Sequence, residues 1–107
     1  MLSICIPIYN FYVDKLVNEL QSQALLLNID FEIILIDDFS DTQFKNQNKH
    51  LAELTRVKYF ELPENIGRSK IRNLFLKHAK FNYLLFLDCD AHIDSKSYLK
   101  KYIDSIN

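Results

Sequence analysis

The sequence predicts an α/β protein with a mostly parallel sheet of about four strands and flanking helices. First, short apolar runs alternate along the chain with longer segments whose apolar residues recur at helical spacing. Second, most of the short runs are nearly continuously apolar, as in strands that are covered on both faces of a parallel sheet. Third, polar clusters follow these runs, where the carboxyl ends of parallel strands would meet.

Four segments are expected to be strands, because each is a short run rich in apolar or β-branched residues. The first, "LSICIPIY", stops at Asn10, and the last, "YLLFLD", stops at an acid. The third, "RVKYFEL", alternates in polarity. The expected strands are residues 2–9, 31–37, 56–62 and 83–88.

The segments between these strands have helical periodicity. Residues 11–27 form one apolar helical face, which comprises Val13, Leu16, Val17, Leu20, Ala24 and Leu27. A weaker helix follows the polar segment after Asp38 and ends at Leu54. A third helix is expected over residues 68–79, with His78 on its apolar side as a packed core residue or a boundary residue, and a fourth over residues 95–106.

Length and composition limit what the chain can be. Its 107 residues are expected to form one domain, 1–107, with the apolar and charged content of an ordinary globular protein. A net charge of −1 gives no basic field, so we expect no nucleic-acid partner. The chain enters its first strand from Met1 without a basic leader, and that run is too short to span a bilayer. We therefore expect a cytoplasmic protein, with Cys5 and Cys89 as free thiols.

Two acids follow the fourth apolar run. Asp88 and Asp90 are two residues apart on extended chain, so their side chains point to the same side. Carboxylates so placed repel each other unless a cation binds them, and oxygen ligands favour a hard ion such as Mn²⁺ or Mg²⁺. The alternative is that both acids lie in a solvated loop or cap the next helix. The polar clusters at the other strand ends favour the metal.

A second acidic pair, Asp37 and Asp38, ends the second strand. One carboxylate can face a cleft and accept a hydrogen bond from a ligand, while the other holds its own loop. The alternative is a local turn, with Ser40 and Asp41 capping the next helix. Both interpretations can hold, because neighbouring side chains on a strand face different ways.

The only glycine, Gly67, lies just before a basic helix start. A sole glycine is expected where the backbone needs it sterically. Arg68, Lys70 and Arg72 follow it, and basic residues beside the free N–H groups of a helix start suit a diphosphate. The alternative is an ordinary surface helix whose arginines pair with nearby glutamates.

Four ordered stretches, "SICIPIYN", "FEIILIDDFSDT", "NIGRSKIRN" and "YLLFLDCDAHI", together resemble the family 2 glycosyltransferases with the GT-A fold. They look like that family's P-x-Y-N strand end, its "VDDxS" strand, its N-x-G-x-x-x-x-R-N loop and its D-x-D strand. The resemblance covers almost the whole chain. It implies a Rossmann-like, nucleotide-sugar-binding half of an enzyme that transfers a sugar to an acceptor hydroxyl with inversion.

The resemblance also implies residue roles. Pro7 and Tyr9 would line the nucleotide pocket, with Tyr9 near the base. Asp38 would accept a hydrogen bond from uracil N3–H of a UDP-sugar, and Asp37 would support the loop.

The implied roles continue along the two later motifs. Asn65, Gly67 and Arg68 would lie beside the nucleotide, and Arg72 would orient the acids near the metal. The two acids that follow the last strand would have different roles. Asp88 would reach the ribose or a metal-bound water, and Asp90 would coordinate the Mn²⁺ or Mg²⁺ ion that bridges the diphosphate.

Two departures from the family pattern stand out. Phe39 occupies a position where the family has glycine or a small residue, so the loop is expected to be bulkier or differently bent. The chain also stops soon after the D-x-D motif. The catalytic base and the acceptor-binding half would therefore lie beyond residue 107, and this chain alone is not expected to catalyse transfer.

The alternative function is a non-catalytic nucleotide-binding or protein-interaction module derived from the same fold. A phosphatase of the haloacid dehalogenase type is disfavoured, because its acid motif belongs on the first strand. The acceptor, a saccharide or a lipid-linked glycan, is left open, and any association with a membrane surface would come from regions outside this chain. Exposed apolar surface is expected to give a tendency to form homodimers.

Overall fold

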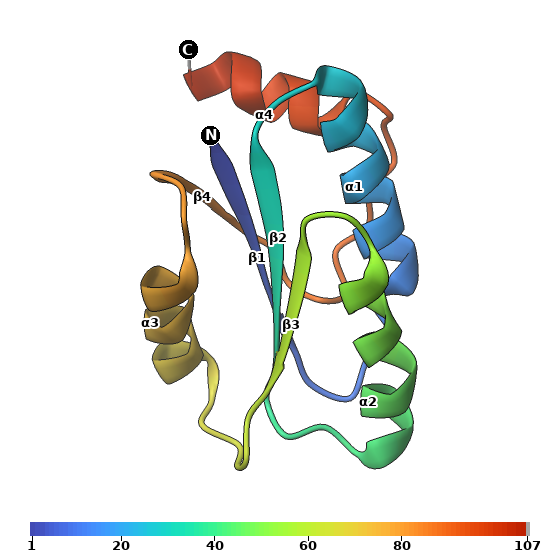
Figure 1. Ribbon diagram of the computed structural model, residues 1–107, viewed down its shortest axis with the longest axis vertical. Coiled ribbons are helices and arrows are strands. Elements are labelled where there is room, and N and C mark those ends of the chain that lie inside the picture. The colour runs from blue at the N-terminus through green and yellow to red at the C-terminus, as the bar shows by residue number, and fades with distance from the viewer. Residues whose placement is uncertain (107) are drawn as a thin grey trace.

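The computed structural model describes residues 1–106 as one parallel sheet with helices on both faces (Figure 1). Its strands are β1 (Leu2–Ile8), β2 (Phe31–Asp37), β3 (Val57–Glu61) and β4 (Tyr83–Phe86). They lie in the order β3-β2-β1-β4, and every neighbouring pair is parallel. The predicted fold class is therefore confirmed.

The helices divide unequally between the two faces of the sheet. They are α1 (Asp14–Leu27), α2 (Thr42–Asn48), a short 3₁₀ helix η1 (Lys49–Glu53), α3 (Arg68–His78) and α4 (Tyr98–Ile106). In Figure 1, α1 and α2 lie on one side of the sheet and α3 lies on the other, while α4 crosses the top of the view; α4 packs in the core cluster that contains α1. This follows from the strand order, because the crossover to β4 runs in the opposite direction to the two before it, and right-handed crossovers then place α3 on the opposite face.

Alternating side chains of the central strands supply both layers of the core. Ile33 and Leu35 of β2 pack in the cluster that contains α1, whereas Ile34 and Ile36 pack with Phe75 of α3. All four β2 side chains are almost fully buried, and burying one such side chain contributes about 1.5–3 kcal/mol. The predicted apolar face of α1 is confirmed, with Leu27 only half-buried.

β4 is shorter than predicted, and Pro7 explains where its pairing ends. Ile8 O accepts a hydrogen bond from Asp38 N on the β2 side, while Cys5 O accepts one from Leu87 N on the β4 side. Pro7, two residues beyond Cys5, also faces β4, but it has no N–H to donate to the next carbonyl. The β1–β4 ladder therefore stops at this point, and Asp88 lies in a loop rather than in the strand.

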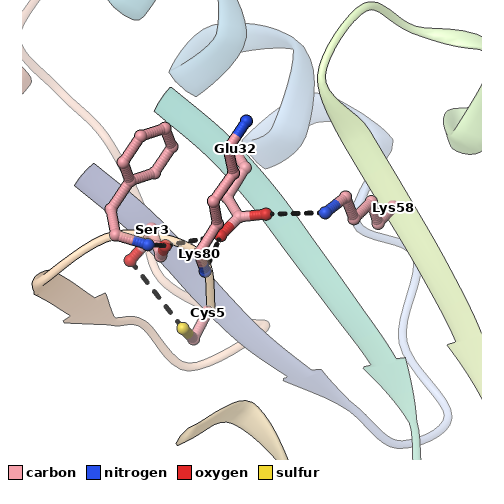
Figure 2. Close-up of polar contacts among 6 residues, drawn as sticks. Ser3, Cys5, Glu32, Lys58 and Lys80 are labelled. Atoms are coloured by element: carbon pink, nitrogen blue, oxygen red, sulfur yellow. Dashed lines mark hydrogen bonds and ion pairs between the residues drawn. The ribbon is translucent and has the colours of Figure 1, made fainter. Parts of the chain in front are cut away.

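Glu32 organises a buried polar cluster near the amino ends of the strands, which the sequence did not reveal (Figure 2). Its carboxylate accepts hydrogen bonds from Ser3 Oγ at 2.6 Å, from the Lys80 backbone N–H at 2.6 Å and from Lys58 Nζ at 3.0 Å. Burial raises the pKa of Glu32, but these hydrogen bonds outweigh burial, so the pKa is lowered overall. The cluster fastens the turn between α3 and β4 to the sheet.

Three smaller expectations have different outcomes. Both cysteines are free thiols, as predicted, and burial raises the pKa of Cys5 to about 12. His78 is not a core residue, because it is exposed, but its ring stacks on Phe60 with the centroids 4.5 Å apart, which fits the boundary position that was the other alternative. Within residues 1–106, no helix has the length and apolar character needed to cross a membrane.

Candidate functional site

The pairing of β1 with β4 ends just before Pro7, and Pro7 lines two adjoining pockets. Both are at the carboxyl edge of the sheet, at the point where the strand order reverses, which is where open α/β sheets bind ligands. The two pockets share five lining residues, namely Pro7, Arg68, Ile71, Asp88 and Asp90.

Each pocket has a distinct chemical character beyond the shared wall. One, of about 300 Å³, is also lined by Tyr9, Phe11 and Asp38, and we name it the aromatic pocket. The other, of about 390 Å³, is also lined by Arg72 and Phe86, and we name it the arginine pocket. Phe11 was not among the predicted site residues. Its position directly after Tyr9-Asn10, at the end of the first strand, could have indicated that it lies at the site.

Asp88 and Asp90 stand on the wall shared by the two pockets, in the loop after β4. Both are exposed, and a turn bond from Ala91 N to Asp88 O, 3.0 Å long, holds the loop between them. The Arg68 guanidinium lies 2.6 Å from Asp88 Oδ1. The predicted juxtaposition of these two acids with the start of α3 is thus present.

The donor set of this wall fits a hard divalent ion only in part. Within residues 1–106, no three His, Cys, Asp or Glu side chains gather closely enough to form a metal site by themselves. Two exposed carboxylates are what a Mg²⁺ or Mn²⁺ ion needs when water and substrate phosphate complete its coordination. The chain can therefore supply part of such a site.

Asp38 is clamped by the loop that precedes α3. Its Oδ1 accepts the Ile66 N–H at 2.8 Å, and its Oδ2 accepts the Gly67 N–H at 3.0 Å and Asn65 Nδ2 at 3.1 Å. This carboxylate also places a negative charge at the amino end of α3, where the helix dipole favours it. The N–H groups of residues 66 and 67 are consequently occupied, so a diphosphate here would depend on other donors.

Gly67 meets a conformational requirement rather than a spatial one. Its φ of 82° and ψ of 167° lie in a region essentially restricted to glycine, and a Cβ added at this position would have nothing within 4 Å of it. Neither Gly67 nor Asn65 lines the two pockets. Their observed role is to hold Asp38.

Asp37 points away from Asp38 and closes its own loop. Its Oδ2 accepts the Ser40 N–H at 2.8 Å, which is the local turn considered from the sequence, while Oδ1 has no hydrogen-bond partner within residues 1–106. Ser40 Oγ in turn accepts the Asn10 N–H at 2.8 Å. The loops after β1 and β2 are therefore linked.

Asn48 is a supporting residue that the sequence did not reveal. It is fully buried, its Nδ2 donates to Phe11 O at 2.7 Å, and its Oδ1 accepts the Val13 N–H at 3.1 Å. These bonds fix the backbone on either side of Tyr12, next to the aromatic pocket. A single asparagine in a polar segment carries no sequence signal of such burial.

Arg72 lies beside the acids without bonding to them. Its guanidinium carbon is 4.5 Å from the centroid of the Phe86 ring, a cation–π contact, and it lines the arginine pocket together with Asp88 and Asp90. In the part of the chain that the structure describes, no hydrogen bond or ion pair joins Arg72 to either acid. The pairing of Arg68 and Arg72 with glutamates, the alternative considered above, is also absent from residues 1–106.

The structure thus brings seven of the ten predicted site residues to the two pockets: Pro7, Tyr9, Asp38, Arg68, Arg72, Asp88 and Asp90. Asn65 and Gly67 act through Asp38, and Asp37 acts through its loop. The fold and this arrangement define the class: a Rossmann-like α/β protein with the GT-A fold.

Comparison with known proteins gives the family within this class. Residues 3–107 match the profile of glycosyl transferase family 2. The chain belongs to this family.

Relatives of known name agree with that assignment. The chain is 31% identical over 98 residues to the Staphylococcus aureus poly(ribitol-phosphate) beta-N-acetylglucosaminyltransferase TarS, covering 89% of this chain and 17% of that protein. It is 34% identical over 109 residues to the Bacillus spizizenii poly(ribitol-phosphate) beta-glucosyltransferase, covering 94% of this chain and 16% of that protein. The chain therefore spans about a sixth of the length of each.

A solved structure with a similar sequence identity has the same fold. The crystal structure of S. aureus TarS 1–349 in complex with UDP superposes with a TM-score of 0.78 and 31% identity, over 98% of this chain and 31% of that one. The match extends over nearly all of the sheet and helices described above.

Proposed function

We propose that this chain is the donor-binding part of a glycosyltransferase that binds a nucleotide-diphosphate sugar, a UDP-sugar, together with Mn²⁺ or Mg²⁺. The observation that carries the proposal is the wall shared by the two pockets, where Asp88, Asp90 and Arg68 meet beside Pro7. The TarS structures with UDP and with UDP-GlcNAc, both similar to this chain, support the choice of nucleotide.

The aromatic pocket suits the nucleoside. Tyr9 and Phe11 are exposed aromatic side chains on its wall, and an aromatic ring can stack on a base. Asp38 lines the same pocket, and a carboxylate accepts about four hydrogen bonds. Three of these are made within the chain, so one site is left for a uracil N3–H.

The diphosphate would lie along the shared wall. Asp88 and Asp90 would hold the divalent ion, which when bound supplies Lewis-acid stabilisation of the departing nucleoside diphosphate. Arg68 and Arg72 would offset the remaining negative charge, because a guanidinium pairs well with phosphate oxygens. The glycosyl group would then extend into the arginine pocket.

Transfer itself would need a base that removes the acceptor proton. In the proposed reaction the acceptor oxygen attacks the anomeric carbon from the face opposite the diphosphate, which inverts the configuration. None of the residues that line the two pockets is assigned this role. The base is expected in the acceptor-binding part of the full enzyme.

The proposal is tested by calorimetric titration of UDP, GDP and CDP into the wild-type chain, each with and without Mn²⁺. UDP is expected to bind most tightly, and its affinity is expected to rise with the ion. Asp90→Asn should abolish the gain from Mn²⁺. Asp94→Asn, an exposed acid nearby that pairs with His92, is the matched control and should keep it.

Two results would refute the proposal. One is the absence of binding by every nucleotide, which would favour the interaction-module alternative. The other is equal loss of the Mn²⁺ effect in Asp90→Asn and Asp94→Asn, which would indicate a general charge effect rather than coordination.

A further inference from the structure

The loop between β1 and α1 carries exposed aromatic side chains that apolar packing alone does not fix. Tyr9, Phe11 and Tyr12 are 54%, 41% and 47% exposed. Side chains with so much exposed surface gain little from burial, so packing alone would leave their positions variable. If the rings keep one arrangement, the backbone of the loop must be held by other contacts.

Asn48, the last residue of α2, supplies two of these contacts. Its side chain is fully buried and uses both of its polar groups on the loop. Nδ2 donates to Phe11 O at 2.7 Å, and Oδ1 accepts the Val13 N–H at 3.1 Å. The two bonds lie on either side of Tyr12. Because a buried backbone group that lost such a partner would be left unsatisfied, Asn48 favours a single conformation of the loop.

The start of the loop is fastened to the same segment of the chain. Ser40 Oγ accepts the Asn10 N–H, and Asn10 Oδ1 accepts the Asp41 N–H, each at 2.8 Å. Asn10 has a φ of 48°, a left-handed conformation that asparagine adopts more readily than most residues. Positions 10, 11 and 13 of the loop are thus all bonded to residues 40–48.

This attachment bears on the candidate site because Phe11 lines the aromatic pocket. Asn48 does not line that pocket, and its two side-chain hydrogen bonds within residues 1–106 both go to the loop. A ring that is already in place binds its ligand more tightly, because less side-chain and loop entropy is lost on binding. Asn48 can therefore influence the affinity for a ligand that it does not touch.

We propose that Asn48 is a positioning residue for the nucleoside, and that it sets the affinity for the base by holding Phe11 in the wall of the aromatic pocket. This inference rests on the proposed function. The acids proposed to bind the metal lie in the loop after β4, to which Asn48 makes no hydrogen bond within residues 1–106. Loss of the Asn48 side chain should therefore weaken nucleoside binding and leave the effect of the metal unchanged.

The test is calorimetric titration of UDP, with and without Mn²⁺, into the wild-type chain and Asn48→Ala. The variant is expected to bind UDP about fivefold more weakly in both conditions, which is the scale of ordering one side chain on binding. It should keep the gain in affinity that Mn²⁺ brings. Asn46→Ala, which makes the same change at an exposed position of α2, is the matched control and should bind UDP like wild type.

A double-mutant cycle shows whether Asn48 acts through Phe11. Phe11→Ala alone is expected to weaken UDP binding about tenfold, because a stacking ring is lost. The double variant Asn48→Ala/Phe11→Ala should bind no more weakly than Phe11→Ala, since no ring is left to position. Losses that multiply to about fiftyfold would show that Asn48 acts on another part of the site, and would overturn the inference.

Stability has to be separated from affinity in these measurements. Asn48→Ala is expected to be less stable than wild type, because Phe11 O and the Val13 N–H lose their partner. The titrations are therefore made below the onset of unfolding, and the number of binding sites is compared with that of wild type. Asn48→Asp keeps an acceptor for the Val13 N–H but has no amide donor for Phe11 O, so it is a second variant with the same expected change in UDP affinity.

Two further results would overturn the inference. One is wild-type affinity for UDP in both Asn48 variants, and the other is loss of the gain from Mn²⁺ in Asn48→Ala, which would indicate a general disturbance of the site. A wild-type chain that binds no UDP would refute the proposed function and the inference with it. The backbone amide signals of residues 11–13, which should shift in Asn48→Ala and not in Asn46→Ala, report on the loop alone.

Discussion

The guanidinium of Arg68, at the first position of α3, lies 2.6 Å from Asp88 Oδ1 in the loop after β4. A basic side chain thus neutralises one of the two acids that are proposed to hold the metal. Both partners are mostly exposed, at 79% and 58%, so the pair is weak and can be exchanged for another ligand.

Replacing Arg68 should change the affinities of metal and nucleotide in opposite directions. In Arg68→Gln, Mn²⁺ alone should bind more tightly, because a competing cation is gone, and UDP without metal should bind more weakly. Each change should be roughly two- to fivefold, since exposed pairs contribute about 0.2–1 kcal/mol. Calorimetry measures both, and Lys70→Gln should alter neither. A parallel fall of both affinities would show that Arg68 acts only on the local structure.

At Gly67 the effect of backbone conformation can be tested separately from steric clashes, because an added Cβ would contact no other atom. Gly67→Ala should lower the free energy of unfolding by about 1–3 kcal/mol, because an L-residue is strained at its φ of 82°. A chain made by semisynthesis with D-alanine at this position should be as stable as wild type, since a D-residue accepts that φ. Chemical denaturation measures both. Equal destabilisation by the two residues would contradict the conformational explanation.

Phe39 is a non-glycine residue at a position whose backbone conformation favours glycine. It adopts a φ of 64° while its side chain is half exposed, so it has the left-handed backbone that glycine accepts without cost. Phe39→Gly should raise the free energy of unfolding by about 0.5–1 kcal/mol. This gain is the backbone strain that glycine relieves, reduced by the extra conformational entropy that glycine has in the unfolded chain. Phe39→Ala keeps the strain and should bring no gain in thermal denaturation. A gain from alanine as large as that from glycine would point to the exposed ring instead.

Glu32 should make the protein sensitive to acid. Its pKa is lowered in the folded state, so its stabilising contribution is complete above the unfolded value, about 4.5, and is lost as the pH falls through the folded pKa. Glu32→Gln should cost about 1.5–3 kcal/mol at pH 7 and flatten the loss of stability below pH about 4.5. Denaturation at a series of pH values measures this. Glu53→Gln, at an exposed acid, should keep the wild-type profile. An unchanged acid slope in Glu32→Gln would contradict the assignment.

The predicted tendency to dimerise is also open to measurement. β3 and β4 are edge strands, and β4 is bonded only to β1, with Tyr83 exposed. Unpaired strand edges favour association with a second chain. Light scattering of the 107-residue chain should show a mass that rises with concentration. A single monomeric mass over the whole range would contradict it.

Much of the fold could be predicted because the residues that determine it are local. Apolar runs such as Phe31–Asp37 and the periodic face of α1 each specify an element, and right-handed crossovers then limit the topology. The convergence of polar residues at one edge followed from parallel pairing alone. The end of β4 could not be predicted, because it depends on which neighbour Pro7 faces.

The buried polar residues that support the fold and the site could not be predicted from the sequence. Glu32 looked like one polar residue in an apolar strand, and its partners are Ser3, Lys58 and the backbone of Lys80, which are distant in sequence. Asn48 likewise bonds to residues more than thirty positions away. Burial of a polar group is decided by partners that only the fold brings together.

The place of the metal ion can be measured by paramagnetic broadening of backbone amide signals by Mn²⁺, with Mg²⁺ as the diamagnetic reference, in the presence of UDP. If the ion binds at Asp88 and Asp90, the amides of Gly67, Arg68, Cys89 and Ala91 should broaden, because they surround the wall shared by the two pockets. The amides of Lys80 and Phe81, at the other end of α3, should remain sharp. Broadening centred on that other end, or none that depends on UDP, would show that the shared wall is not the donor site.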